Sequence, residues 1–300
     1  RKGVDGIVVD LRGNGGGSLA EATSLTGLFI DTGPVVQVKD AFGKVEVEED
    51  PDPGIAYGGP LAVLVDRDSA SASEIFAGAI QDYGRGLILG EPTFGKGTVQ
   101  TLVDLNRYVP ADQTDLGRLR LTMAEFFRIS GGSTQLKGVV PDVQFPTAGD
   151  GSKHGERALD NALPWGTIRP ARYKALGSND VETLRRASTE RIARDPGFQM
   201  LLARNRLLRE LDEEKVISLR EQDRRVETKR REKVLEEDKN AFLRSHGITP
   251  VDPDAEHPDE EAMDKEREAI GRIQVNEAAR VLADSVRVGS AATPKAAMRD

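Results

Sequence analysis

Residues 61–82 have the sequence LAVLVDRDSASASEIFAGAIQD. The five apolar residues at its start are typical of a buried strand. Ser71 and Glu74 have the spacing of a capping box, and a helix that begins there would carry Ile75 and Phe76 as apolar positions. The stretch therefore predicts a strand, a turn built of small residues, and a helix with a serine at its start.

The first half of the chain repeats this alternation of strand and helix. A further helix is predicted after the glycine run at residues 15–17, and further strands at residues 7–11, 35–39, 87–90, 98–105, 118–129 and 139–145. Residues 50–54 and 150–153 have the composition of loops, and the second loop is the predicted domain boundary. The pattern predicts an α/β core over residues 1–150.

Ser71 is a potential nucleophile. Free backbone N–H groups and the positive end of the helix dipole would surround it, and both stabilise developing negative charge. Such a hydroxyl also needs a base, and the three histidines, His154, His246 and His257, lie downstream in what we expect to be another domain. The plainer interpretation, that Ser71 only caps the helix, stays open on this stretch alone.

Lys96 is the candidate base. It lies between two glycines in Phe94-Gly-Lys-Gly-Thr98, one helix and one strand after Ser71. A lysine amine accepts a proton only when it is neutral, which burial away from other charges favours. Taken alone, Lys96 could also be an ordinary surface lysine.

Four motifs in this order resemble the C-terminal processing peptidases, in the long bacterial form known as tail-specific proteases. They are VDGIVVDLRGNGGG at residues 4–17, SASASE at 69–74, GEPTFGKGTVQ at 90–100 and KGVVPD at 137–142. The resemblance implies an α/β protease core with a mixed sheet and helices, like that of ClpP and crotonase. It also implies a mainly α-helical C-terminal domain.

The same resemblance implies a role for each residue of the site. Ser71 would be the nucleophile, Lys96 the general base, and Gln100 a residue that orients the lysine. The spacing independently favours the last role, because Lys96, Thr98 and Gln100 would share a face if residues 96–103 form a strand.

Backbone amides would form the oxyanion hole, as the resemblance implies. The donors are Ala72 N–H and Gly17 N–H, with Gly16 as the neighbouring alternative. Asp82 matches a supporting acidic position, for which we expect a role in helix packing or orientation rather than in the chemistry.

Two other enzyme classes were compared with this pattern. Residues 90–96 match the start of a phosphate-binding loop, but Gly97 stands where Ser or Thr is needed and a strand follows. Residues 15–20 fit a dinucleotide-binding glycine motif, with Asp40 as the ribose-binding acid. The dinucleotide alternative leaves the serine and lysine motifs unexplained. A further alternative is a catalytically silent peptide-binding or scaffold fragment.

Composition excludes several classes of function. The net charge of −8 and the pI near 5.2 argue against nucleic-acid binding. With no cysteine, the chain can have no disulfide framework and no cysteine metal site, and we expect no metal or cofactor. No apolar run is long enough for a membrane span.

Residues 151–300 have a different composition and are predicted to form a charged, mainly helical domain. Residues 196–245 mix Arg and Glu in the manner of solvated helices, and the paired arginines are balanced by neighbouring glutamates. We expect a loop over residues 252–261, a last helix over 262–286 and a loose tail over 289–300.

The chain begins at Arg1 and enters a strand pattern at once, which is typical of a fragment. The resemblance implies that a signal peptide, a PDZ domain and an earlier part of the protease lie upstream. It also implies an ATP-independent endopeptidase of the Gram-negative periplasm that cleaves proteins with apolar C-termini. An adaptor or lipoprotein partner is implied as well.

Overall fold

The computed structural model describes residues 3–108, 115–146, 153–177, 180–214, 216–252 and 259–292. Contacts divide the chain into two units. The first contains Arg1–Ile88, Pro92–Pro141 and Ser152–Asn179, and the second contains Leu89–Glu91, Asp142–Gly151 and Asp180–Asp300. The predicted boundary at residue 150 therefore differs from the contact-based division, because residues 152–179 pack with the first unit.

One sheet has the strand order β1-β4-β5-β8, with parallel pairing of β1 with β4 and of β5 with β8. Its strands are β1 (Ile7–Asp10), β4 (Leu61–Val65), β5 (Leu87–Gly90) and β8 (Val143–Gln144). All five residues of β4 are buried, as expected for a parallel strand covered on both faces. The strand predicted over residues 139–145 is confined to the two residues of β8.

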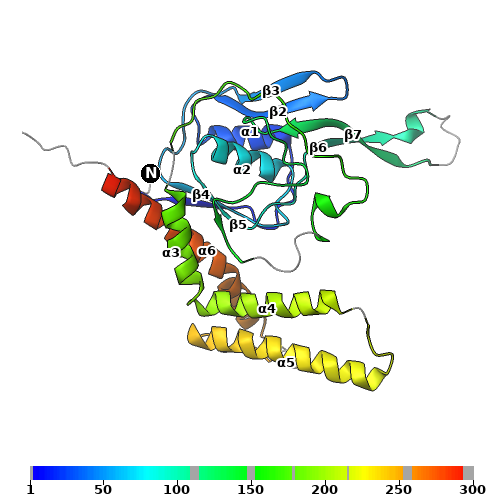
Figure 1. The fold of residues 1–300 in the computed structure, drawn as a ribbon, viewed down its shortest axis with the longest axis vertical. Helices are drawn as coiled ribbons and strands as arrows, with labels where there is room; N and C mark the ends of the chain where they lie inside the picture. Colours follow the sequence, from blue (N-terminus) through cyan, green and yellow to red (C-terminus); the bar gives the residue numbers. More distant parts are fainter. Residues whose placement is uncertain are drawn as a thin grey trace, which may run out of the picture. The chain divides into compact units, whose positions relative to one another are not determined.

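A second sheet is antiparallel, with the order β3-β2-β7-β6, and its two hairpins lie side by side in Figure 1. Its strands are β2 (Gly33–Asp40), β3 (Val45–Asp50), β6 (Thr98–Asp104) and β7 (Arg118–Phe127), with a 3-10 turn at Leu105–Tyr108 after β6. Strand β3 was not predicted from the sequence. Its VEVEED sequence alternates, but the valines are exposed, so the strand carries no buried apolar signal.

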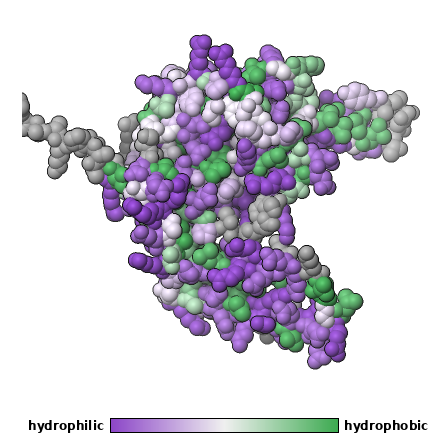
Figure 2. Space-filling view, in the orientation of Figure 1, coloured by the Kyte–Doolittle hydropathy of each residue, from purple (hydrophilic) through white to green (hydrophobic). Residues whose placement is uncertain are grey.

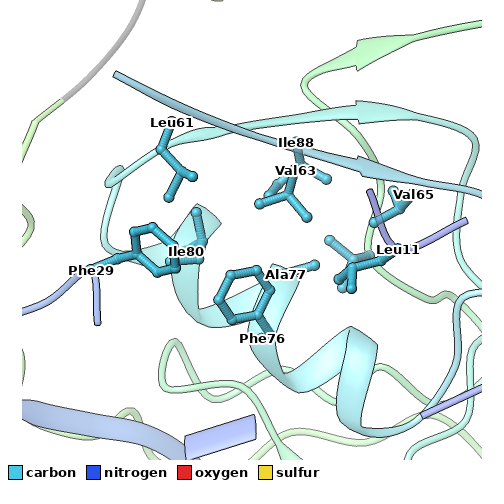
Figure 3. Close-up of a cluster of buried hydrophobic side chains, with 10 residues drawn as sticks. Leu11, Phe29, Leu61, Val63, Val65, Phe76, Ala77, Ile80 and Ile88 are labelled. Carbon is cyan, nitrogen blue, oxygen red and sulfur yellow. The ribbon is translucent and has the colours of Figure 1, made fainter. Parts of the chain in front are cut away.

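Helices α1 (Leu19–Gly27) and α2 (Ala72–Asp82) contact each other and the antiparallel sheet, and α2 also packs against the parallel sheet. Phe76 and Ile80 of α2 belong to a buried cluster with Val63 and Ile88 of the parallel sheet, shown in Figure 3. The opposite side of α2 packs with residues of the antiparallel sheet in a second cluster. Since both faces of α2 are buried, the position of its N-terminus is tightly constrained.

The second unit contains the helices α3 (Val181–Ile192), α4 (Pro196–Glu213), α5 (Glu221–Ser245) and α6 (Glu260–Ala292). Figure 2 shows mainly hydrophilic side chains over α4 and α5, which fits the prediction of solvated, charged helices. The mixed α/β core and the helical C-terminal region are confirmed. The last helix is longer than predicted and includes residues 289–292, while the rest of the predicted tail lies outside the described residues.

In the described part of the chain, none of the helices combines the length and the apolar character that a bilayer crossing requires.

Candidate active site

Ser71 precedes α2 in an unusual backbone conformation. Its φ is 57° and its ψ is −114°, whereas a capping residue normally has an extended backbone. Within the described residues its side chain makes no capping hydrogen bond. A strained backbone at the start of a helix also occurs where a nucleophilic serine lies on a sharp turn into a helix. Capping alone therefore does not account for Ser71.

The glycine loop after β1 lies directly against this turn. Ala70 N–H donates to the carbonyl of Asn14 at 3.0 Å, and Ser69 Oγ donates to the carbonyl of Leu11 at 2.8 Å. Gly16 has a φ of +101°, and a Cβ there would lie 2.8 Å from Ser71 Cβ and 2.9 Å from Ala72 N. Only glycine permits this approach.

The loop also distinguishes between the two glycines considered for the oxyanion hole. Gly16 N–H donates to Asn14 Oδ1 at 3.0 Å and is therefore occupied. The N–H groups of Gly17 and Ala72 have no acceptor in the part of the chain that the structure describes, and both residues line one cavity of about 260 Å³. The geometry favours Gly17 and Ala72 as the donors to an oxyanion.

We expect Gly16→Ala to lower any peptidase activity of the full-length protein by about a hundredfold. The new Cβ would collide with backbone atoms, including Ala70 O at 2.6 Å, so the loop must move away from Ser71. The matched control is Gly15→Ala, because a Cβ at Gly15 meets nothing within 4 Å. Equal activity of the two variants in a peptide cleavage assay would contradict the close approach described here.

Lys96 lies in the loop before β6, not in the strand that the spacing argument assumed, since β6 begins at Thr98. The residue is half-buried. Its carbonyl accepts from Thr134 Oγ1 at 3.0 Å. Its amine makes no ion pair within the described residues.

Glu74 connects Ser71 to Lys96. Its side chain is fully buried, and the N–H groups of Ser71 and Lys96 donate to the same oxygen, Oε2, at 2.8 and 3.0 Å. Oε1 accepts from Thr93 Oγ1 at 2.6 Å and from Gly95 N–H at 2.7 Å. The capping-box spacing is the only sequence signal for Glu74, and it gives no indication of the contact with the lysine loop.

The electrostatics of Glu74 follow from its burial. Burial raises the pKa of its carboxyl to about 7, although each of the four hydrogen bonds lowers it. A carboxyl that titrates near neutrality therefore supports the backbone on both sides of the candidate dyad.

Gln135, which was not among the candidate residues, holds the lysine loop from the other side. Its buried Oε1 accepts from Gly97 N–H at 2.8 Å, and its Nε2 donates to Glu156 Oε1 and to the carbonyl of Leu163, both at 3.1 Å. A lone glutamine in a loop carries no sequence signal for such a role. The segment around Glu156, which includes a 3-10 turn at Glu156–Ala158, therefore supports the lysine loop.

His154 lies just beyond the predicted domain boundary at residue 150. His154 belongs to the first unit, where its Nε2 lies 3.0 Å from Asp68 Oδ1 and its ring packs edge-on against Phe94, with 5.9 Å between centroids. An imidazole therefore contacts residues beside both motifs. In the described residues it makes no hydrogen bond to Ser71 or Lys96, and His257 lies outside them.

Gln100 and Asp82 are the two remaining candidate residues. Gln100 is on β6 with an exposed side chain, and no hydrogen bond joins it to Lys96 in the residues described. Asp82, near the end of α2, forms an ion pair with Arg128 at 2.6 Å and accepts from Ser130 Oγ at 3.1 Å. These contacts attach α2 to the chain that follows β7, which fits a positioning role for Asp82.

The dinucleotide alternative fits the structure poorly. Such a site needs a parallel strand after the first helix, but β2 belongs to the antiparallel sheet and forms a hairpin with β3. Asp40 lies at that hairpin turn and accepts from the N–H groups of Phe42 and Lys44. In the residues described, no cluster of His, Asp or Glu is placed to hold a metal ion.

Comparisons with known proteins agree with the motifs. Residues 1–145 match Peptidase family S41, and residues 150–287 match the C-terminal domain of tail specific protease. The chain belongs to peptidase family S41. The resemblance drawn from the four motifs is therefore confirmed.

Three relatives of this S41 chain illustrate the similarity. The tail-specific protease of Haemophilus influenzae is 44% identical over 266 residues, which are 85% of this chain and 38% of that protein. A chloroplastic C-terminal processing peptidase of Tetradesmus obliquus is 40% identical over 144 residues, covering 48% of this chain and 29% of that protein. The solved photosystem II D1 C-terminal processing protease has 39% identity and a TM-score of 0.42, covering 47% of this chain and 35% of its own. The chain thus spans less than two fifths of the length of each relative.

Proposed function

We propose that the protein is an ATP-independent serine endopeptidase that cleaves proteins near their C-termini through a Ser71 and Lys96 dyad. The observation that carries the proposal is the shared contact with Glu74, where the N–H groups of both residues meet one buried carboxylate oxygen. The positive φ of Ser71 supports it, because such strain persists where the surrounding structure enforces it.

The proposed reaction has two stages. Ser71 Oγ attacks the scissile carbonyl while neutral Lys96 Nζ accepts its proton, and the N–H groups of Gly17 and Ala72 bind the oxyanion. The tetrahedral intermediate then collapses as the Lys96 ammonium donates its proton to the leaving amine, which leaves an acyl-enzyme. Lys96 next deprotonates a water that hydrolyses the ester.

Two further residues would act indirectly. Gln100 would orient the Lys96 amine when substrate is bound. Asp82 would hold α2, and thus Ser71, through its ion pair with Arg128. In this proposal residues 1–150 provide the C-terminal part of the protease core, and the charged helices after residue 150 form a separate domain.

The names of the relatives, a tail-specific protease and a C-terminal processing peptidase, support the choice of substrate. We propose protein substrates with apolar C-terminal tails, a periplasmic location and an adaptor or lipoprotein partner. The proposal of protein substrates with apolar tails is supported by family membership and by the apolar residues around the cavity beside Ala72.

The test compares two versions of one unfolded reporter protein, one ending in apolar residues and one ending in Asp residues. We expect the full-length protein to cleave the apolar version about ten times faster, because an acidic tail must be desolvated to bind an apolar surface. Mass spectrometry of the products locates the cleavage. Equal rates for both tails would refute tail specificity, and absence of cleavage would refute the peptidase proposal.

A further inference from the structure

The lysine loop, residues 94–97, has a fully satisfied backbone. Each of its N–H and C=O groups makes a hydrogen bond. The carboxylate of Glu74 accepts from the two amides at the centre of the loop. Phe94 N–H donates to the carbonyl of Ser69 at 3.0 Å, which joins the loop to the serine turn. Because backbone groups held in this way have little freedom to move, these partners fix the point from which the Lys96 side chain starts.

Glu156 is attached to both ends of this loop. Its own N–H donates to the carbonyl of Phe94 at 3.0 Å. Its carboxylate Oε1 accepts from Nε2 of Gln135 at 3.1 Å, and Oε1 of the same amide accepts from Gly97 N–H at 2.8 Å. Lys96 lies between these two points of attachment. A displacement of Glu156 would therefore change the anchoring on both sides of the lysine.

The contact between Glu156 and the lysine loop is specified at several positions. The side chains of Glu156 and Gln135 are both buried, so each needs the hydrogen bond that the other provides. Gly155 has a φ of +81°, and a Cβ there would collide with the carbonyl oxygen of Phe94. Only glycine at this position lets the following amide approach that carbonyl.

Glu156 also lies outside the part of the chain that matches the peptidase family. That match ends at residue 145, whereas residues 150–287 match the C-terminal domain of tail specific protease. Contacts nevertheless group Glu156 with Ser71 and Lys96 in the first unit. The beginning of the C-terminal region thus takes part in holding the candidate site.

We propose that Glu156 is a positioning residue for the dyad, which sets the place of Lys96 through the carbonyl of Phe94 and the side chain of Gln135. The inference rests on the proposed peptidase function. Among the described residues, no hydrogen bond joins Glu156 to Ser71 or to the Lys96 amine, so its effect is indirect. Proton transfer requires hydrogen-bond reach between the serine hydroxyl and the lysine amine, so a displaced loop lowers kcat and leaves KM nearly unchanged.

The experiment compares Glu156→Ala with Glu156→Gln in the full-length protein. Glu156→Ala should lower kcat for peptide cleavage by about tenfold and change KM by less than about twofold. Glu156→Gln keeps an oxygen that can accept from Gln135 and should stay within about twofold of the unaltered kcat. The matched control is Asp160→Ala, which removes an exposed carboxylate from the same segment and should change neither constant.

A double variant tests whether Glu156 acts through Gln135. Gln135→Ala removes the acceptor of Gly97 N–H and should lower kcat by about tenfold or more, again with KM nearly unchanged. Because the two side chains form one path to the loop, the double variant should be no worse than Gln135→Ala alone. Each kcat is expressed per active site, counted with a covalent serine reagent, so that a loss of folded protein does not lower it.

Three results would overturn the inference while leaving the peptidase proposal intact. They are a rise in KM at constant kcat, an equal loss in both Glu156 variants, and losses that multiply in the double variant. If Glu156→Ala folds poorly, the kcat and KM of Gln135→Ala still decide the matter. If the unaltered protein cleaved no peptide, the peptidase proposal itself would fail, and the inference with it.

Discussion

Ser71→Ala and Lys96→Ala are each expected to lower peptide cleavage by the full-length protein at least about a thousandfold. The first removes the attacking oxygen, and the second removes the group that takes its proton. Because the two act as one unit, the double variant should be no worse than either single variant. The measurement is kcat/KM for a peptide that the unaltered protein cleaves.

Two further variants separate the base from a simple positive charge. Lys96→Arg keeps the charge but cannot give up its proton, so it should be as inactive as Lys96→Ala. Lys44→Ala removes an exposed lysine on the β2–β3 hairpin and should leave cleavage unchanged. Near-normal cleavage by Lys96→Arg would show that another group is the base.

Glu74→Ala is expected to destabilise the fold by about 3 kcal/mol or more and to lower cleavage as well. The substitution leaves the N–H groups of Ser71, Gly95 and Lys96 without their acceptor. Each such loss costs about 1–3 kcal/mol when the group is buried. Denaturant unfolding measures the change, and Glu182→Ala, in the exposed first turn of α3, is the control that should cost little.

The pKa of Glu74 adds a second test of the same residue. Burial raises this pKa to about 7, above its ordinary value of 4.5, so the folded state binds the proton more tightly than the unfolded state. The stabilisation that this tighter proton binding provides is fully present when the pH is below the ordinary pKa. It is lost as the pH rises through the pKa of the folded state. From these two values it amounts to about 3 kcal/mol.

Glu74→Gln, which does not titrate, provides the reference for that test. The unfolding free energy of the unaltered protein should fall relative to that of Glu74→Gln between pH 4.5 and pH 8. A constant difference across this range would mean that the four hydrogen bonds keep the carboxyl ionised throughout.

The strand, turn and helix around Ser71 could be predicted from the sequence because each has a local signal. The apolar run of β4 and the Ser71 to Glu74 spacing describe contacts within one short stretch. The glycine loop was predictable as a loop. Its role, an approach of Gly16 to Ser71 that leaves no room for a Cβ, depends on packing between distant segments.

The residues that hold the Lys96 loop in place could not be predicted from local sequence signals. Gln135 contacts Gly97 and Glu156 through hydrogen bonds between residues far apart in the chain, and no periodicity marks such a residue. The contacts of His154 with Asp68 and Phe94 likewise join residues far apart in the chain. The strand predicted over residues 98–105 is found as β6, but Lys96 lies before it, outside the strand that the spacing argument assumed.

The most direct test of the account is intact-mass analysis of the full-length protein quenched during turnover of an ester or peptide substrate. We predict one added acyl group, located on Ser71 by fragmentation, absent from Ser71→Ala and strongly reduced in Lys96→Ala. An acyl group on another residue, or its persistence in Ser71→Ala, would contradict the assignment of the nucleophile.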